Sequence, residues 1–206
     1  SYSHGRLFFD NTPPEVSGLY PKTDFFINVA ELSYSLNEDL IEGFVVWSPI
    51  DGTQPVKIDM LSNELLAGTF GIGTLNGQIG LADGVVYNVE ISIKDKALNE
   101  TNSTLAENIT FDVTKPEFTQ VSPVASSRVN TQTVSWNVNE NLQSGKYTWI
   151  HMGGEADPAA PHEFNLSDNL LKPGFGDNSK LPPLNLVVNA MYRITLEGTD
   201  LAGNTG

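Results

Sequence analysis

Acidic and amide side chains recur in two sets along this sequence, and they are the residues best suited to binding a cation. The first set is Asp10, Glu38, Asp39, Asp95 and Asn99, and the second is Asp112, Glu140, Asn141, Asp200 and Asn204. Ca²⁺ takes about 6 to 8 oxygen ligands, and carboxylate and amide oxygens suit it. Two carboxylates about 4 Å apart repel by about 4 kcal/mol at an effective dielectric near ~20. If the fold gathers each set, the sequence predicts calcium as a cofactor.

The same residues have a second interpretation as ordinary turn formers. Asp and Asn side chains hydrogen-bond to their own backbone two residues further on, and they are common in hairpins for that reason. The sequence leaves both interpretations open.

Catalytic chemistry finds little support. Five polar residues cluster around a proline-containing segment: His151, Glu155, Asp157, His162 and Glu163. Their spacing matches no known zinc site, and we interpret the segment as a solvated loop. A Gly-x-Ser-x-Gly motif is absent, and the three histidines have no evident orienting partner. Cysteine is also absent, which excludes disulfides, thiolate metal sites and a cysteine nucleophile. We therefore predict no enzyme and no catalytic residues.

Charge and hydropathy limit the partners and the fold class. Eleven basic and twenty-five acidic residues give a net charge of −14, which argues against nucleic acid and against anionic membrane surfaces. No apolar run approaches the roughly 20 residues needed to cross a bilayer, so we predict no membrane insertion. Short runs of alternating polar and apolar residues between turn signals indicate an all-β protein.

An internal repeat divides the chain. FDNTPPE at 9–15 returns as FDVTKPE at 111–117, an offset of 102 that also carries Trp47 onto Trp149. Later the offset becomes 105, where Tyr87–Asp95 matches Tyr192–Asp200. A fixed period of this kind indicates tandem modules. We predict one module at 10–112, a second at 113–206, and a separate segment at 1–9.

Polar and apolar residues alternate along short runs of each module, as they do in half-buried strands. Several short strands in a hundred residues indicate a two-sheet sandwich. Its motifs are a Phe-Asp-x-Thr-x-Pro opening, a strand ending in Asn-Glu, and an Asp-x-Ala-x-Asn hairpin. Together these motifs resemble the bacterial Ig-like (Big-type) modules of surface proteins, adhesins and secreted multidomain enzymes. The resemblance implies two tandem Ig-like antiparallel β-sandwiches. In such a sandwich the loops that carry each acidic set meet at the pole where the module opens. The first hairpin departs from the pattern, with Leu98 in place of the glycine found at Gly203.

The sequence predicts that the second module is one strand short. In the first module the hairpin is followed by Thr104–Phe111, the natural last strand, whereas Asn204 is followed by only two residues. At the offset of 102, Leu7 aligns with Ile109 and Phe9 with Phe111. We therefore predict that segment 1–9, through Leu7, Phe8 and Phe9, is a donor strand for a neighbouring unit. The alternative is a chain boundary without structural meaning, with 1–9 either pairing inside the first module or fraying.

The predicted function is a non-catalytic structural unit of an extracellular or cell-surface fibre or stalk. Its partners would be copies of itself joined head to tail, or adjacent Ig-like repeats. One alternative is a carbohydrate-binding module pair, with Trp47, Trp136 and Trp149 stacking on sugars, although these tryptophans are more simply core residues. Another alternative is an adhesin whose protein ligand binds the insert at Ala156–His162. Glycosylation sequons, relevant only in a host that uses them, are at Asn99, Asn102, Asn108 and Asn165.

Overall fold

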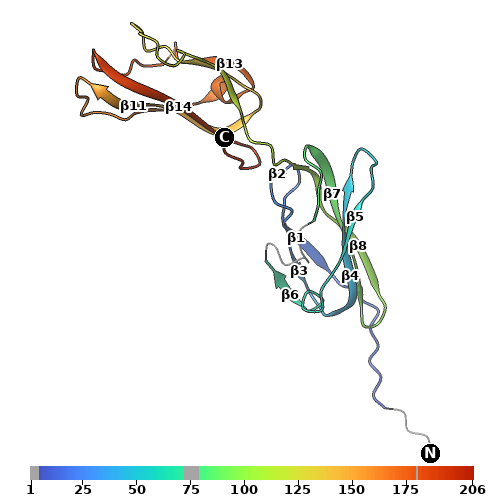
Figure 1. The fold of residues 1–206 in the computed structure, drawn as a ribbon. Helices are drawn as coiled ribbons and strands as arrows, with labels where there is room; N and C mark the ends of the chain where they lie inside the picture. Colours follow the sequence, from blue (N-terminus) through green and yellow to red (C-terminus); the bar gives the residue numbers. More distant parts are fainter. Residues whose placement is uncertain (1–4, 72–78, 180) are drawn as a thin grey trace, which may run out of the picture. The chain divides into compact units, whose positions relative to one another are not determined.

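The fold consists of two β units. The computed structural model describes residues 5–71, 79–179 and 181–206. The chain separates into two compact units, Ser1–Val113 and Thr114–Gly206 (Figure 1). Among the described residues the regular structure is all β-strand apart from one short 3-10 helix, η1 (Asp168–Leu171).

The first unit is a sandwich of two sheets. One sheet has the order β1-β3-β6, formed by β1 (Val16–Tyr20), β3 (Ser33–Leu36) and β6 (Gly68–Phe70). The other has the order β2-β8-β7-β4-β5, formed by β2 (Phe26–Ile27), β8 (Glu100–Phe111), β7 (Val85–Asp95), β4 (Leu40–Pro49) and β5 (Val56–Asp59). Antiparallel pairing of β4, β7 and β8 places alternate apolar side chains on the inner face.

The second unit repeats this plan. Its sheets have the orders β13-β10-β9 and β12-β11-β14. The strands are β9 (Phe118–Ser122), β10 (Ser135–Val138), β11 (Leu142–Gly154), β12 (His162–Asn165), β13 (Gly174–Asp177) and β14 (Ala190–Asp200). Strand for strand, β9, β10 and β13 correspond to β1, β3 and β6, while β11, β12 and β14 correspond to β4, β5 and β7. The predicted fold class, all-β with two tandem sandwiches, is confirmed.

The cores contain the residues that the alternation predicted. Tyr34 and Leu36 are buried in β3, and Trp136 and Val138 are buried at the equivalent positions of β10. All three tryptophans, Trp47, Trp136 and Trp149, are buried in the cores. The carbohydrate-binding alternative therefore loses the aromatic side chains on which it depended.

The hairpin after β7 has the same backbone conformation as the one after β14, despite the difference in sequence. Leu98 has a φ of 72° and Gly203 a φ of 93°, both in the left-handed region. A side chain with a Cβ is strained there by about 1–2 kcal/mol, while glycine loses about 0.5–1 kcal/mol in entropy. The turn type is thus conserved between the modules, with the strain in the first.

We expect Leu98→Gly to stabilise the first unit, because the relief of strain exceeds the entropic loss. The net gain is up to about 1 kcal/mol, which corresponds to a rise of at most about 4–8 °C in the unfolding temperature of a domain this size. Scanning calorimetry measures it. The reciprocal change Gly203→Leu should lower the unfolding temperature of the second unit. A Leu98→Gly chain that unfolds at a lower temperature would show that the exposed leucine side chain contributes more than its backbone costs.

Candidate functional site

The outer edge of β14 is largely unpaired in the part of the chain that the structure describes. In the first unit, β7 is hydrogen-bonded to β4 on one side and to β8 on the other. In the second, β14 is hydrogen-bonded to β11, and its other edge meets only the start of the next hairpin arm, where Thr199 pairs with Thr205. Gly198 and Gly206 exchange two backbone hydrogen bonds of 3.0 Å there. The position that β8 fills in the first unit is therefore open along most of β14.

Side-chain burial differs between the two strands in the same sense. Tyr87, Val89 and Ile91 of β7 are only 3%, 0% and 2% exposed. Their equivalents in β14 are Tyr192, Ile194 and Leu196, and each of these is only partly buried. Both strands point these residues into a sandwich, but β7 is paired with β8, whereas the described residues place no such strand beside β14.

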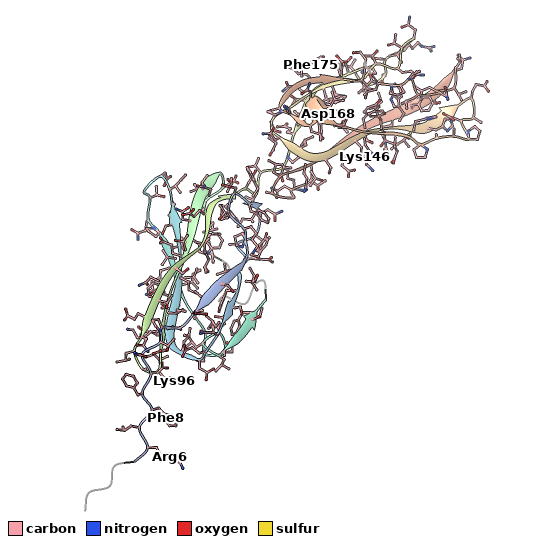
Figure 2. The ribbon with its side chains drawn as sticks, turned by 180° about the vertical axis from the view of Figure 1, so that it is seen from behind. Arg6, Phe8, Lys96, Lys146, Asp168 and Phe175 are labelled. Carbon is pink, nitrogen blue, oxygen red and sulfur yellow. The ribbon has the colours of Figure 1, made fainter. Side chains whose placement is uncertain are left out.

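The N-terminal segment has the opposite property, an apolar surface with nothing covering it. Leu7, Phe8 and Phe9 are 90%, 94% and 89% exposed. Residues 5–10 belong to no strand, and Figures 1 and 2 show this segment, with Arg6 and Phe8 labelled, leading away from the first unit. Residues 5–9 do not pair inside the first module, but the fraying that the same alternative allowed agrees with their exposure. Residues 1–4 of the predicted donor strand lie outside the described residues.

A cluster of carboxylates forms at one end of the first unit. Asp10 precedes β1, Glu38 lies between β3 and β4, and Asp95 ends β7. One carboxylate oxygen from each of these residues lies within 4.8 Å of those from the other two. The sandwich thus brings together three of the five side chains of the first acidic set, from widely separated parts of the sequence.

Asp95 also performs the turn-forming role that the sequence left open. Its Oδ1 accepts hydrogen bonds from the backbone N–H groups of Ala97 and Asn99 at 2.8 and 2.9 Å, and its Oδ2 accepts one from Asn99 Nδ2 at 2.8 Å. Burial raises the pKa of Asp95, but the hydrogen bonds from Asn99 and Ala97 together outweigh burial and leave the pKa below its ordinary value. Asp95 is therefore held as a carboxylate by its own hairpin.

Glu38 and Asp39 are adjacent in sequence but have different surroundings. Burial, followed by the charges of Asp10, Asp95 and Asp39, raises the pKa of Glu38. Asp39 is directed elsewhere, with Oδ2 accepting a 2.9 Å bond from Lys96 Nζ and Oδ1 a 3.0 Å bond from the Ala67 N–H. The structure separates Asp39 from the cluster that contains Glu38. Asn99 contacts the cluster through its amide nitrogen, which donates to Asp95.

The second module repeats the arrangement around its hairpin. Asp200 Oδ1 accepts from the N–H groups of Ala202 and Asn204 at 2.9 and 2.8 Å, and Asp200 Oδ2 accepts from Asn204 Nδ2 at 2.8 Å. Glu140 follows β10 as Glu38 follows β3, and Asn141 is exposed. Asp112 is at the end of the first unit. The hairpin geometry is therefore a property of the module itself.

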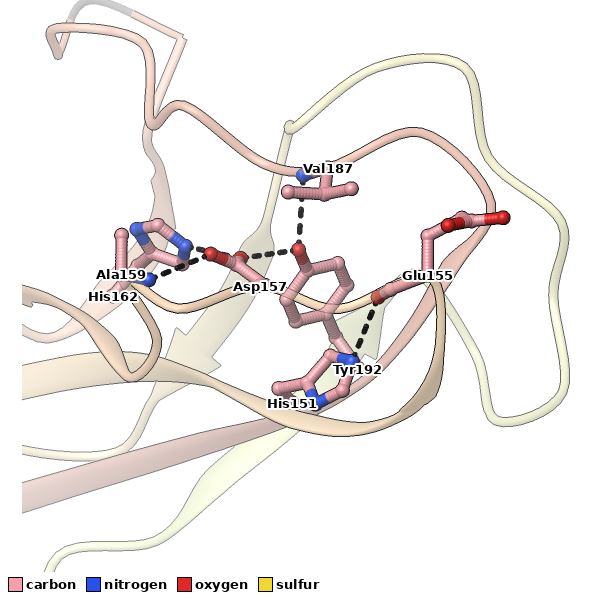
Figure 3. Close-up of polar contacts among 7 residues, drawn as sticks. All are labelled: His151, Glu155, Asp157, Ala159, His162, Val187 and Tyr192. Carbon is pink, nitrogen blue, oxygen red and sulfur yellow. Dashed lines mark hydrogen bonds and ion pairs between the residues drawn. The ribbon is translucent and has the colours of Figure 1, made fainter.

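A buried polar network lies in the segment that the sequence suggested was a solvated loop. That interpretation is wrong for Asp157, which is buried, and for His151, His162 and Glu163, which lie in β11 and β12. The Asp157 side chain is 1% exposed. Its Oδ2 accepts hydrogen bonds from His162 Nε2 at 2.6 Å and from the Tyr192 hydroxyl at 2.5 Å (Figure 3). The Tyr192 hydroxyl in turn accepts a bond from the Val187 N–H at 2.9 Å. Asp157 thus connects the loop to the start of β14. No sequence pattern links it to Tyr192, because their contact depends on tertiary packing.

This network makes the second unit sensitive to acid. Hydrogen bonds from Tyr192 and then His162 lower the pKa of Asp157 to about 2. A carboxylate with a depressed folded-state pKa adds stability above its unfolded pKa, near ~4, and that stability is lost as the pH falls from there towards 2. We expect Asp157→Asn to lower the unfolding temperature of the second unit at pH 7 and to reduce its decline between about pH 5 and 2.

The control for this prediction is Glu155→Gln, in the same loop. Glu155 is exposed, and its backbone oxygen, not its carboxylate, contacts His151 at 3.0 Å. The unfolding temperature of this variant, measured over the same pH range, should match that of the native chain. Equal pH profiles for Asp157→Asn and the native chain would refute the assignment.

The predicted sequons differ in accessibility. Asn102, Asn108 and Asn165 are exposed. The amide nitrogen of Asn99 is bonded to Asp95 and also donates to the backbone oxygens of Asp10 and Thr12 at 3.4 and 3.3 Å. Glycosylation of Asn99 would therefore break the hairpin contacts described above.

Known proteins similar to this chain were found among solved structures. No protein-family model matches the sequence, and no curated protein matches it. Among solved structures, it is similar to the FN1-FN3 domains of chicken CNTN1, with 15% identity, 97% of this chain and 64% of that chain covered, and a TM-score of 0.47. It is also similar to a tetra-tandem repeat in the extending region of a large adhesion protein, with 17% identity, 94% and 46% covered, and a TM-score of 0.32. This chain therefore spans less than two thirds of either structure. The described residues include no helix that meets the length and hydropathy required to span a membrane.

Proposed function

We propose that this chain is a non-catalytic structural repeat of an extracellular or cell-surface fibre or stalk. Each two-unit repeat is linked to the next repeat by a β-strand that completes the sheet at β14. The strand comes from another copy of the chain or from an adjoining repeat. The observation that carries the proposal is the contrast between the fully buried inner face of β7 and the partly buried inner face of β14.

The energetics favour a partner for this edge. An open strand edge leaves backbone N–H and C=O groups unpaired and is prone to pairing with another chain. Each large apolar side chain that becomes buried contributes roughly 1.5–3 kcal/mol, and strand β8 of the first unit supplies buried Ala106, Ile109 and Phe111. Strand addition gives affinity through main-chain hydrogen bonds and specificity through alternate side chains. Such linkage builds linear arrays.

The experiment that tests this proposal extends the chain beyond Gly206 with a second copy of residues 102–111. Gly206 is equivalent to Thr101, so the added segment follows in the register of the first hairpin. The extension should raise the unfolding temperature of the second unit and suppress self-association in sedimentation runs. The matched control carries Ile109→Ser and Phe111→Ser in the added copy and should do neither.

Two results of this experiment separate the sources of the strand. Concentration-dependent oligomers of the unextended chain would support donation between copies, whereas a monomer that the extension stabilises would support an adjoining repeat. An unextended monomer that gains no stability from the extension would contradict the proposal.

The proposal includes Ca²⁺ bound at the acidic cluster of the first unit, where it would stiffen the structure. The support is the convergence of Asp10, Glu38 and Asp95, together with the raised pKa of Glu38, which reflects burial and repulsion that a cation would offset. A cation also keeps carboxylates ionised, so bound Ca²⁺ should lower the pKa of Glu38.

Calcium binding is tested with two adjacent substitutions. Glu38→Gln removes a carboxylate from the cluster and should weaken Ca²⁺ binding about ten-fold or more, because affinity depends on ligand charge. Asp39→Asn removes the same charge from the neighbouring residue, which pairs with Lys96, and should leave the affinity nearly unchanged. Titration calorimetry measures both. The absence of any heat of binding at millimolar Ca²⁺ in the native chain would refute this part of the proposal.

A further inference from the structure

The first unit pairs β7 with β8, whereas the described residues of the second unit include β14 but no strand paired along most of its outer edge. Along β7 and β8, Val85 pairs with Phe111, Val86 with Thr110 and Tyr87 with Ile109. Phe111 and Ile109 are buried and Thr110 is only partly so, because alternate residues of β8 point into the sandwich. This pair gives a register that can be transferred to β14.

The two offsets of the internal repeat give the equivalents of β7 and of β8 separately. On the acceptor side, β7 positions 85, 86 and 87 correspond to Ala190, Met191 and Tyr192. On the donor side, β8 positions 109, 110 and 111 correspond to Leu7, Phe8 and Phe9. The side chains fit at each place. Leu7 replaces an isomeric isoleucine, Phe9 replaces a phenylalanine, and Phe9 faces an alanine where its counterpart faces Val85.

The start of β14, where the added strand would pair, is held in position by hydrogen bonds within the second unit itself. The Tyr192 hydroxyl accepts the Val187 N–H at 2.9 Å, as the Tyr87 hydroxyl accepts the Ala82 N–H at 2.9 Å. In the second unit Asp157 adds a further bond to the same hydroxyl (Figure 3). The tyrosine ring beside the open position therefore has the anchoring that it has in the completed sandwich.

We infer that residues 5–9 of a second copy add antiparallel to the start of β14, with Leu7 opposite Tyr192, Phe8 opposite Met191 and Phe9 opposite Ala190. Leu7 and Phe9 then cover the core of the second unit, and Phe8 lies on the outer face. This register rests on the proposed strand linkage and narrows it to one donor and one alignment.

The absence of cysteine from the native chain allows a direct test by disulfide formation. One chain carries Phe8→Cys and a separate chain carries Met191→Cys, so that only contact between two molecules can join them. Both native side chains are largely exposed, and neither change disturbs a core. Directly opposed residues have Cα atoms about 4.5–5.5 Å apart, within the range of about 4.4–6.8 Å that a disulfide accepts.

The matched control pairs Phe8→Cys with Arg193→Cys, which is on the same exposed face of β14 two residues further on. Diagonal neighbours are about 7–8 Å apart, so a disulfide there would be strained. In a glutathione redox buffer, the mixed disulfide with Met191→Cys should exceed that with Arg193→Cys by about ten-fold or more.

The outcomes separate this register from the general proposal. Equal mixed-disulfide yields, or a higher yield with Arg193→Cys, would overturn the register. If the cysteine-free chain still forms oligomers that the added strand suppresses, strand linkage survives this failure. If it forms none and the added strand has no effect, both fail together.

Discussion

A chain that carries Leu7→Ser and Phe9→Ser is expected to associate with itself more than about 100-fold more weakly than the native chain. The two side chains align with the buried Ile109 and Phe111, and burial of each contributes roughly 1.5–3 kcal/mol. Both are almost fully exposed within the chain itself, so the substitutions should leave the folding of either unit unchanged. Sedimentation velocity over a dilution series measures the effect.

Phe8→Ser is the matched control for this prediction. Phe8 lies between the two residues, is as exposed as they are, and is equally apolar. General stickiness of the segment would make all three residues equivalent. Strand addition in the inferred register places Phe8 at the position of Thr110, on the outer face, so this variant should associate nearly as well as the native chain. A loss as large as that of the double variant would argue for non-specific association.

The second large effect is expected for Trp47→Ala in the core of the first unit. Trp47 is fully buried and packs edge-on against Tyr87, with ring centroids 6.2 Å apart. Replacing a buried tryptophan by alanine removes apolar contacts and leaves a cavity, which costs about 3–5 kcal/mol. Denaturant unfolding of the first unit should therefore shift strongly towards lower concentrations of denaturant.

The control is Ile50→Ala, close to Trp47 in sequence but 57% exposed, which should change stability by less than about 0.5 kcal/mol. This comparison also bears on function. A tryptophan that served sugar binding would be exposed, and its loss would leave stability intact. A Trp47→Ala chain as stable as the Ile50→Ala chain would contradict the core assignment.

Much of the architecture was available from local pattern. Alternation of polar and apolar residues is a property of neighbouring positions, so it predicted the buried faces of β3 and β10 without any knowledge of packing. The internal repeat predicted that the two modules share a strand order, because equivalent sequences form equivalent sandwiches. The segment after the first hairpin was predicted in the same way to be the last strand of its module, and it forms β8.

The candidate site depended more on tertiary structure. The sequence placed Glu38 and Asp39 together as cation ligands, but only the folded chain directs Asp39 to Lys96 and leaves Glu38 beside Asp10 and Asp95. It also suggested that Asp157 was a solvated loop residue, whereas packing buries it against Tyr192. Such contacts join residues that are far apart in the chain.

The sequence by itself determined the fold class, the repeat and the hairpins, because these follow from local periodicity and turn chemistry. Tertiary structure decided which carboxylates converge, that Asp157 is anchored to Tyr192, and that the inner face of β14 is only partly covered. Burial and side-chain pairing are set by which strands lie side by side, and that depends on the assembled sheets and not on any single stretch of sequence.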